Sequence, residues 1–366
     1  MLKNSKMVTL KKIITDKKLD GVLVTHATNI AYLTDYYNFS KEEREAYLLI
    51  TKNSQFILTD GRYSEAIQKH LPDFRLITLT SHNIIDKQLK KLTKTKGLKK
   101  VGFEGENLSF LEYQKFSKIF IEFVHLDLSS TRQLKNKEEI AKIKKACQIA
   151  NLAFKFILKQ IKFGISEKDL SYKLELFIKD QKVQFSFPAI VAFGKNSSIP
   201  HHQTGNEILN SKNGQFVLLD FGVKFENYCS DMTRTIFFGK ASKKQTKIYQ
   251  TVFNAQQKAI EFISEKLKKN LPILAKDVDK VAREYILSQG FPNIPHSLGH
   301  GVGLEVHESP RLSPKSKDIL KSGMVFSIEP GIYLKGFGGV RIEDLFTIEN
   351  NQLIQLTRAA KKLIEL

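Results

Sequence analysis

The sequence predicts an α+β protein in which an α/β domain precedes a larger domain of helices and antiparallel strands. Three observations lead to this prediction. A chain of 366 residues exceeds the size at which a single hydrophobic core usually stops growing. Short apolar runs alternate with helical patterns in the first 130 residues, whereas helices and strands form separate blocks afterwards. A polar stretch separates the two patterns, so we expect domains at residues 1–132 and 133–366.

Short apolar runs in the first domain predict the strands of one sheet. These runs are residues 21–25, 46–51, 55–60, 75–79, 101–105 and 123–128. Amphipathic segments near residues 62–70, 83–95 and 109–119 predict helices between the strands. Strands that alternate with helices are typical of an α/β domain with its own sheet.

The second domain begins with a predicted long helix. Apolar residues from Ile140 to Ile161 follow one another at alternating spacings of three and four, which places them on one helical stripe. Ser166 is the predicted N-cap of the next helix, and residues 243–268 and 275–289 predict two more. Strand-like runs cover residues 185–194, 215–223, 228–239, 324–334 and 339–348. We therefore expect helices packed against an antiparallel sheet.

Composition excludes several classes of protein. No segment resembles a membrane span or a secretory signal, so we expect a cytoplasmic protein without a membrane partner. The cysteines Cys147 and Cys229 are too few for a disulfide scaffold or a cysteine-ligated zinc module. The net charge of +20 suggests nucleic-acid binding. However, the excess is mostly lysine, is spread over both parts, and lacks clusters of arginine and aromatic residues, so we expect no nucleic-acid partner.

Acidic residues occur inside apolar, strand-like runs, where an unpaired carboxylate is costly. Asp220 closes QFVLLD, and Asp231 lies in YCSDMTRT. A hairpin that turns at Phe225 and Glu226 would place the two acids directly opposite each other, with Cβ atoms roughly 5 Å apart. Their repulsion would then require a cation. The alternative is that Asp220 is a turn residue and Asp231 pairs with Arg234.

Further acids and histidines extend this set. Glu329 in FSIEPG and Glu343 in VRIEDL repeat the pattern of a carboxylate in a strand-like run. His300 and His307 lie in SLGHGVGLEVHE, whose glycines make it a poor core segment but let the backbone approach a site closely. Four carboxylates and a histidine form an oxygen-rich set that is large enough for two divalent ions.

Together these motifs resemble those of a known family. LLDFGV, YCSDMTRT, HSLGHGVGLEVHE, FSIEPGIY and GVRIED occur in the order and near the separations found in metallopeptidases of the pita-bread fold, in the branch of aminopeptidase P and prolidase. The resemblance covers essentially the whole chain. It implies a creatinase-type N-terminal domain, a pita-bread catalytic domain and a homodimer.

The resemblance also implies a metal site with two divalent ions. Manganese is expected before cobalt, zinc or iron. The implied ligands are Asp220, Asp231, His300, Glu329 and Glu343. Glu329 is additionally expected to take a proton from the attacking water and pass it to the leaving nitrogen.

Other residues are expected to act on the substrate. The resemblance implies that His201 and His307 donate hydrogen bonds as charge develops on oxygen, with His202 as the alternative to His201. The expected substrate-facing residues are His296, Tyr333 and Arg341. For Arg341, an ion pair that orients a ligand carboxylate is an equally good interpretation.

The resemblance implies an exopeptidase of aminopeptidase P type, which hydrolyses the N-terminal Xaa-Pro bond of peptides through metal-activated water. One alternative is a Xaa-Pro dipeptidase, or prolidase, which is restricted to dipeptides. Another is a catalytically silent binding protein on the same fold, and the complete ligand set opposes it. A nucleotide-binding enzyme is suggested only by AFGKNSS and KGFGG, and neither matches a phosphate-binding fingerprint.

Overall fold

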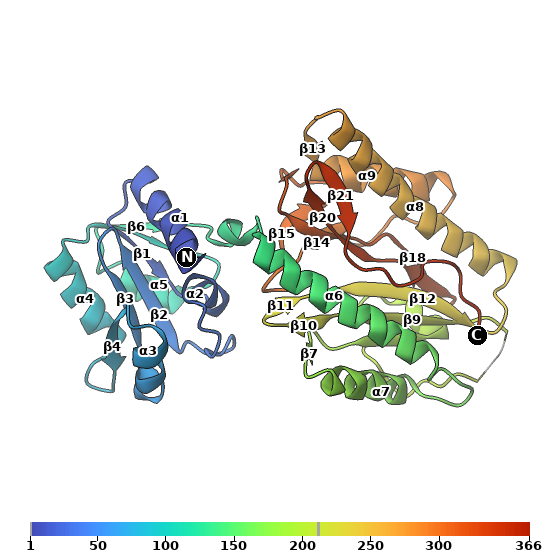
Figure 1. The fold of residues 1–366 in the computed structure, drawn as a ribbon, viewed down its shortest axis with the longest axis horizontal. Helices are drawn as coiled ribbons and strands as arrows, with labels where there is room; N and C mark the ends of the chain where they lie inside the picture. The colour runs from blue at the N-terminus through green and yellow to red at the C-terminus, as the bar shows by residue number, and fades with distance from the viewer. Residues whose placement is uncertain (1, 211–212) are drawn as a thin grey trace. The chain divides into compact units, whose positions relative to one another are not determined.

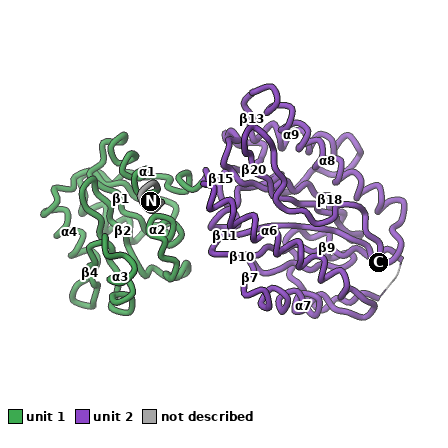
Figure 2. The backbone as a smooth tube through the Cα atoms, viewed as in Figure 1, with its two compact units in different colours: residues 1–132 green, residues 133–366 purple. Residues whose placement is uncertain are grey.

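The computed structural model describes residues 2–210 and 213–366. The chain divides into two compact units, residues 1–132 and 133–366 (Figure 2). Within the described part of the chain, no helix has both the length and the apolar character that crossing a membrane requires. Each unit has its own hydrophobic core, so the two are described separately.

The first unit is built on a six-stranded sheet with the order β4-β3-β2-β1-β5-β6 (Figure 1). The strands are β1 (Gly21–Val24), β2 (Ala46–Thr51), β3 (Gln55–Asp60), β4 (Arg75–Leu79), β5 (Lys100–Phe103) and β6 (Glu122–His125). β2 pairs antiparallel with β1 and β3, whereas the remaining pairs are parallel. The predicted α/β domain is confirmed, and each predicted strand overlaps an observed one.

Helices connect and cover these strands. They are α1 (Leu2–Asp16), α2 (Ala27–Thr34), η1 (Gly61–Tyr63), α3 (Ser64–His70), α4 (Ile85–Lys96), α5 (Phe110–Phe116) and η2 (Ser129–Arg132). The segments from α3 to α5 were predicted, whereas α1 and α2 were not. α2 is buried from Thr28 to Thr34, so it lacks the polar face that reveals a helical period.

The second unit contains two pairs of helices. They are α6 (Lys137–Leu158) with α7 (Glu167–Asp180), and α8 (Lys243–Lys268) with α9 (Ala275–Ser288). α6 begins after Asn136, whose side chain accepts hydrogen bonds from the N–H groups of Glu138 and Glu139. It ends at Leu158, so Ile161 lies beyond the helix that was predicted to include it. Ser166 caps α7 as predicted.

Antiparallel pairing joins the strands of the second unit, as predicted. The sheets with three or more strands have the orders β11-β10-β7, β12-β9-β8 and β15-β14-β17-β20-β21. The strands up to α8 are β7 (Gln184–Phe185), β8 (Ile190–Phe193), β9 (Gln215–Phe221), β10 (Val223–Phe225), β11 (Tyr228–Cys229) and β12 (Met232–Phe238), with η3 (Gly194–Ser198) after β8. The later strands are β13 (Ile273–Leu274), β14 (Gly299–Gly301), β15 (Glu308–Leu312), β16 (Ile319–Leu320), β17 (Val325–Ile328), β18 (Gly331–Leu334), β19 (Gly338–Arg341), β20 (Asp344–Glu349) and β21 (Gln352–Gln355).

Each helix pair packs on strands of its own part of the unit (Figure 1). Phe154 of α6 and Leu174 of α7 share a core with Leu219 of β9. Val252 of α8 and Phe326 of β17 belong to the other core. Because side chains alternate along a strand, the residue after Leu219 points to the face opposite the α6–α7 core. That residue is Asp220, so the packing of β9 directs this acid away from the helices.

Candidate metal centre

The predicted acidic ligands lie at ends of strands and in the short breaks between them. Asp231 separates β11 from β12, Glu329 follows β17, and Glu343 lies between β19 and β20. Asp220 is the penultimate residue of β9, and His300 is the middle residue of β14. A residue at a break is released from the strict alternation of side chains. The acids can therefore turn toward one point from several strands.

Asp220 and Asp231 belong to one hairpin, but the predicted register is wrong. The turn residues are Glu226 and Asn227, with φ values of 44° and 70°, so the turn lies one residue later than predicted. Asp220 consequently lies opposite Thr233, and not opposite Asp231. This shift of two positions preserves the face, because side chains repeat every second residue along a strand.

Three of the four predicted acidic ligands lie around the imidazole of His300. Its Nε2 lies 3.2 Å from Glu329 Oε1, 3.7 Å from Asp231 Oδ2 and 4.0 Å from Glu343 Oε1. Among the described residues, one ligand atom each of Asp231, His300 and Glu343 lies within 4.8 Å of the others. Asp220 is linked to the same cluster by side chains, because Arg341 contacts both Asp220 and Thr233, and Thr233 donates to Glu343. Burial raises the pKa of Asp231, and the charges of Glu343 and then Asp220 raise it further.

The unpaired atoms of this cluster fit a bound cation. Asp220 Oδ1, Asp231 Oδ1 and Glu343 Oε1 are buried and accept no hydrogen bond from the described residues. An unsatisfied buried polar atom costs about 1–3 kcal/mol, and more if it is charged. Burial, followed by the charges of Glu329 and Asp220, raises the pKa of Glu343 to about 8. Divalent ions would satisfy these oxygens and offset the repulsion, and a set of carboxylates with one imidazole suits them.

The backbone fixes the orientation of His300. Its Nδ1 lies 3.1 Å from the carbonyl oxygen of Gly301, and its own N–H donates to Ser327 Oγ at 3.1 Å. A hydrogen bond at Nδ1 leaves Nε2 to face the acids. A Cβ atom at Gly299 would overlap the Ser327 carbonyl oxygen, and one at Gly301 would overlap that of Ser309. The glycines on either side of His300 therefore permit close packing of β14 against the backbone of its neighbours, whereas the predicted close approach to a bound group stays a prediction.

Two buried hydroxyl groups that the sequence analysis missed hold the acids in place. Thr233 Oγ1 donates to Glu343 Oε2 at 2.7 Å, and Ser327 Oγ donates to Glu329 Oε1 at 3.1 Å. Thr233 is two residues after Asp231, and Ser327 is two residues before Glu329. Since alternate residues of a strand share a face, this spacing is a signal that could have identified both.

Arg341 is occupied by contacts within the protein. Its Nη2 lies 2.6 Å from Asp220 Oδ2, and its Nε donates to Thr233 Oγ1 at 3.0 Å. Its Nη1 donates to the Tyr333 hydroxyl at 2.8 Å and to the carbonyl oxygen of Pro200 at 3.3 Å. These contacts support the interpretation in which Arg341 orients a ligand carboxylate.

The alternative roles for the first two acids are wrong. Arg234 does not pair with Asp231, because its Nη2 lies 2.6 Å from Asp344 Oδ1 in a fully buried ion pair. Asp220 is not a turn residue, because it lies within β9. Asp231 therefore lacks the ordinary explanation for a carboxylate in an apolar run, whereas Asp220 has Arg341 as a partner for one of its two oxygens.

Two histidines of the glycine-rich region border the cluster. The ring centroids of His307 and His300 are 4.4 Å apart, with an interplanar angle of 81°. His296 Nε2 lies 2.9 Å from the Tyr333 hydroxyl, and its Nδ1 lies 2.8 Å from the carbonyl oxygen of Ser297. A carbonyl oxygen only accepts, so Nδ1 of His296 donates to Ser297, and in the neutral imidazole Nε2 accepts from the Tyr333 hydroxyl. His296 and Tyr333 thus form one hydrogen-bonded wall beside the acids.

The two adjacent histidines of the upstream loop have different surroundings. The Nε2 of His202 lies 2.9 Å from Oε2 of the buried Glu167. His201 is exposed, and its charge contributes to lowering the pKa of His307, after burial and the charge of His300. His202 is thus held by Glu167, which lies outside the acidic cluster, and the role of His201 at the cluster stays a prediction.

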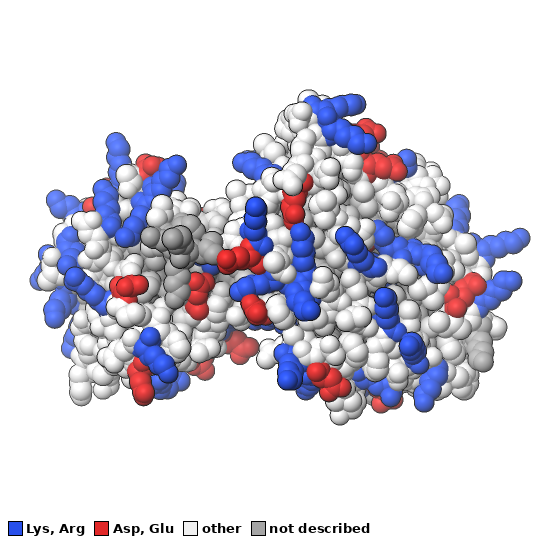
Figure 3. Space-filling model, in the orientation of Figure 1, with Lys and Arg blue, Asp and Glu red and all other residues white. Residues whose placement is uncertain are grey.

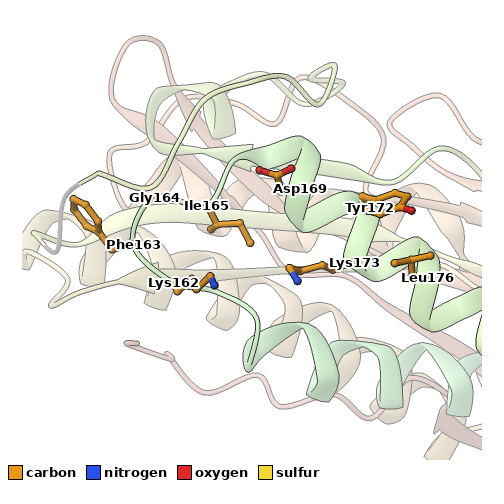
Figure 4. A pocket seen from close by; sticks show the side chains of 8 residues that line it. All are labelled: Lys162, Phe163, Gly164, Ile165, Asp169, Tyr172, Lys173 and Leu176. Atoms are coloured by element: carbon orange, nitrogen blue, oxygen red, sulfur yellow. The ribbon is translucent and has the colours of Figure 1, made fainter.

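A separate hollow of about 410 Å³ lies beside the first part of α7 (Figure 4). It is lined by Lys162, Phe163, Gly164, Ile165, Asp169, Tyr172, Lys173 and Leu176. Its acid, Asp169, accepts a hydrogen bond from the N-cap Ser166 at 2.7 Å. Because this carboxylate serves the helix end, the hollow does not reproduce the chemistry of the acidic cluster.

The basic side chains do not form a continuous stripe on the face shown in Figure 3. Lys and Arg are scattered over both units, and acidic side chains lie among them. A surface that reads nucleic acid concentrates its positive charge along one face or element. The visible distribution is more typical of a hydrated, lysine-rich surface.

Comparison with known families assigns both units. A model of metallopeptidase family M24 matches residues 141–350, which is more than half of the chain. The chain belongs to metallopeptidase family M24. A model of the creatinase/prolidase N-terminal domain matches residues 7–133 of this M24 metallopeptidase. The predicted family, its hydrolytic class and its pita-bread fold are thereby confirmed, and the family implies divalent metal ions.

Relatives of this M24 metallopeptidase match it over nearly their whole length. The Xaa-Pro dipeptidase of Pyrococcus horikoshii is 32% identical over 99% of this chain and 99% of its own. The solved structure of the Xaa-Pro dipeptidase from Bacillus anthracis has a TM-score of 0.89 and 32% identity, with 100% of both chains covered. The structure of the X-Pro aminopeptidase from Thermotoga maritima has a TM-score of 0.82 and 29% identity, with 95% of this chain and 98% of that chain covered.

Proposed function

We propose that the protein is a metal-dependent peptidase that hydrolyses Xaa-Pro dipeptides. The observation that carries this proposal is the set of buried, unpaired oxygens of Asp220, Asp231 and Glu343 beside His300. Such a set is costly without a cation. Membership of family M24 supports peptide hydrolysis as the chemistry.

The preference for dipeptides departs from the order given by sequence analysis, which placed the aminopeptidase first. The relatives from Pyrococcus horikoshii and Bacillus anthracis are dipeptidases and match this chain along its full length. The aminopeptidase from Thermotoga maritima is also similar, at a lower identity and TM-score. The comparison therefore favours the dipeptidase, with the aminopeptidase as the second candidate.

The proposed ligands of two divalent ions are Asp220, Asp231, His300, Glu329 and Glu343. When bound, such ions make hydroxide available near neutral pH and polarise the scissile carbonyl. Buried arginine and hydroxyl groups hold the ligand carboxylates, so the protein preorganises its donor atoms before an ion arrives.

Glu329 is the proposed proton carrier. Its side chain is 14% exposed, compared with 6% for Asp231 and 3% for Glu343, so it is accessible to a substrate. Burial opposes its ionisation, but the hydrogen bond and charge of His300 outweigh burial and lower its pKa to about 2. The carboxylate is therefore ionised when His300 is charged and no ion is bound. We propose that, once His300 binds an ion instead, Glu329 accepts a proton from water and delivers it to the proline nitrogen, which carries no N–H while in the peptide bond.

The histidines supply hydrogen bonds to the substrate in this proposal. Burial, followed by the charge of His300, lowers the pKa of His307, so its imidazole is neutral and can donate one N–H. His201 would approach from its loop after β8. Donors that face the carbonyl oxygen stabilise the negative charge that develops there.

Metal analysis and a pair of peptides test the proposal. Purified protein should contain a divalent metal, or bind added Mn²⁺, and should then hydrolyse a Xaa-Pro dipeptide faster than the matching Xaa-Pro tripeptide. Equal or faster hydrolysis of the tripeptide would favour the aminopeptidase. A protein that neither binds metal nor cleaves either peptide would be a binding protein on the same fold.

A further inference from the structure

We propose that Glu167 is a positioning residue that holds the loop of residues 194–205, and through it His201, in the catalytic arrangement. His202 links Glu167 to His201 in this proposal. The inference rests on the proposed function, because it assumes that His201 acts on a peptide substrate. It explains why the loop contains two adjacent histidines with different surroundings.

Glu167 is a buried carboxylate whose oxygens are used entirely by this loop and its flanks. Its side chain is 0% exposed and lies in the first turn of α7. The donors to Oε1 are the N–H of Phe193 at 2.7 Å and Asn196 Nδ2 at 2.9 Å. The donors to Oε2 are the N–H of Gly205 at 2.8 Å and His202 Nε2 at 2.9 Å. A carboxylate with two donors on each oxygen offsets its cost of burial and constrains every donor.

The donors come from both ends of the loop. Phe193 is the last residue of β8, and Asn196 lies in η3, directly after it. Gly205 is at the other end of the loop, where its carbonyl oxygen also accepts from the N–H of Lys168 at 3.0 Å. The side chain of Glu167 on α7 therefore binds both ends of the loop, and His201 lies between these two ends in the sequence.

Contacts with β19 hold the same loop against the metal centre. The N–H of Gly339 donates to Ser197 Oγ at 2.8 Å, and Arg341 Nη1 donates to the carbonyl oxygen of Pro200. Arg341 is also the partner of Asp220. The loop is therefore fixed by the metal centre on one side and by Glu167 on the other, and His201 is adjacent to residues fixed by both.

Kinetics of single and double variants test the role of Glu167. Glu167→Gln keeps the shape of the side chain but presents an amide NH₂ to donors, so it should lower kcat roughly tenfold to a hundredfold. KM and bound metal should stay near their wild-type values. His202→Asn removes one of the four donors and should lower kcat in the same direction by less. Glu175→Gln is the matched control, because Glu175 lies on α7 but pairs with the exposed Lys179.

The decisive comparison uses a background that lacks His201. If Glu167 acts by positioning His201, then Glu167→Gln should lower kcat less than about twofold in the His201→Ala variant. The effects of the two substitutions are not additive when both act through the side chain of His201. An equal fall in both backgrounds would contradict the proposal and assign Glu167 a general structural role. Wild-type kcat in both Glu167→Gln and His202→Asn would contradict it as well.

Hydrogen exchange provides a readout that does not depend on activity. Glu167→Gln should accelerate exchange of the Phe193 and Gly205 amides, whereas His201→Ala should leave them unchanged. Unchanged exchange in Glu167→Gln would overturn the proposal even if the protein is a peptidase. Failure of the wild-type protein to hydrolyse peptides with Mn²⁺ would instead contradict the proposed function, and the exchange rates would still show whether Glu167 holds the loop.

Discussion

Replacing Arg341 by methionine should destabilise the second unit by about 3–5 kcal/mol in the absence of metal, which is the usual cost of removing one partner from a buried ion pair. The Nη2 of Arg341 lies 2.6 Å from Asp220 Oδ2, and their side chains are 5% and 11% exposed. Methionine retains much of the apolar stem, so the main loss is electrostatic. Thr233 and Tyr333 each lose a donor in addition.

Divalent ions should recover part of this loss. A ligand present at a hundred times its Kd stabilises the native state by about 2.7 kcal/mol through mass action. In Arg341→Met, an ion would also supply the positive charge that Asp220 has lost. The difference in unfolding free energy between wild type and variant should consequently be smaller with Mn²⁺ than with EDTA.

Urea unfolding followed by circular dichroism measures both quantities. Because the chain has two units, the relevant transition is the one that added Mn²⁺ shifts. Arg358→Met is a suitable control, since Arg358 is exposed and its loss should change stability by no more than about 0.5 kcal/mol. In EDTA, the free energy of unfolding of Arg341→Met could instead lie within about 1 kcal/mol of the wild-type value. In that case the inference that the buried acids need the positive charge of Arg341 is wrong.

Three further predictions concern the site and its support. Glu329→Gln should retain the circular dichroism spectrum but lower kcat by roughly 10²–10⁴-fold; wild-type turnover would exclude Glu329 as proton carrier. Asp220→Ala should lower bound metal, measured by elemental analysis, with activity falling in proportion; full metal content would remove Asp220 from the ligands. Lys135→Met should destabilise by about 3–5 kcal/mol in melts, because Lys135 Nζ lies 3.1 Å from Glu308 Oε2 and both side chains are 2% exposed. Lys179→Met, at an exposed pair, should cost less than about 1 kcal/mol.

Long amphipathic helices were the part of the fold most accessible from sequence. The helix predicted over residues 243–268 has those bounds in the structure, and its N-cap Ser242 forms a capping box with Gln245. α1 was missed although Met7, Leu10 and Ile14 are buried at helical spacing, because the apolar Val8 lies on the exposed face and blurs that stripe. α2 could not be found by periodicity, because nearly all of it is buried.

The register of the hairpin depended on the left-handed backbone conformation of its two turn residues, which their residue types do not clearly indicate. Asn227 tolerates a left-handed φ, but Glu226 rarely adopts one, so the pair lacks the glycine that usually marks a two-residue turn. The predicted turn was consequently one residue early. The acids nevertheless share a face, because the error in register was an even number of residues.

The acids of the candidate site were recognisable individually, but their supporting groups were not. A carboxylate in a strand-like run contradicts the local pattern, and this made Asp220 and Glu343 conspicuous. Glu167 contradicts nothing locally, because an acid in the first turn of a helix is already favourable. Its partners begin 26 residues later at Phe193, so only the tertiary structure reveals its role.

The proposed ligands are divided by the α8–α9 helix pair, with Asp220 and Asp231 before it and His300, Glu329 and Glu343 after it. Neither the part of the chain before α8 nor the part after α9 contains all the proposed ligands. We therefore expect tight ion binding only after these two parts have packed together. A chain cut at residues 239–242, between β12 and α8, should regain its affinity for the ion only when the fragments recombine. Ion uptake would thus report completed assembly during synthesis or refolding.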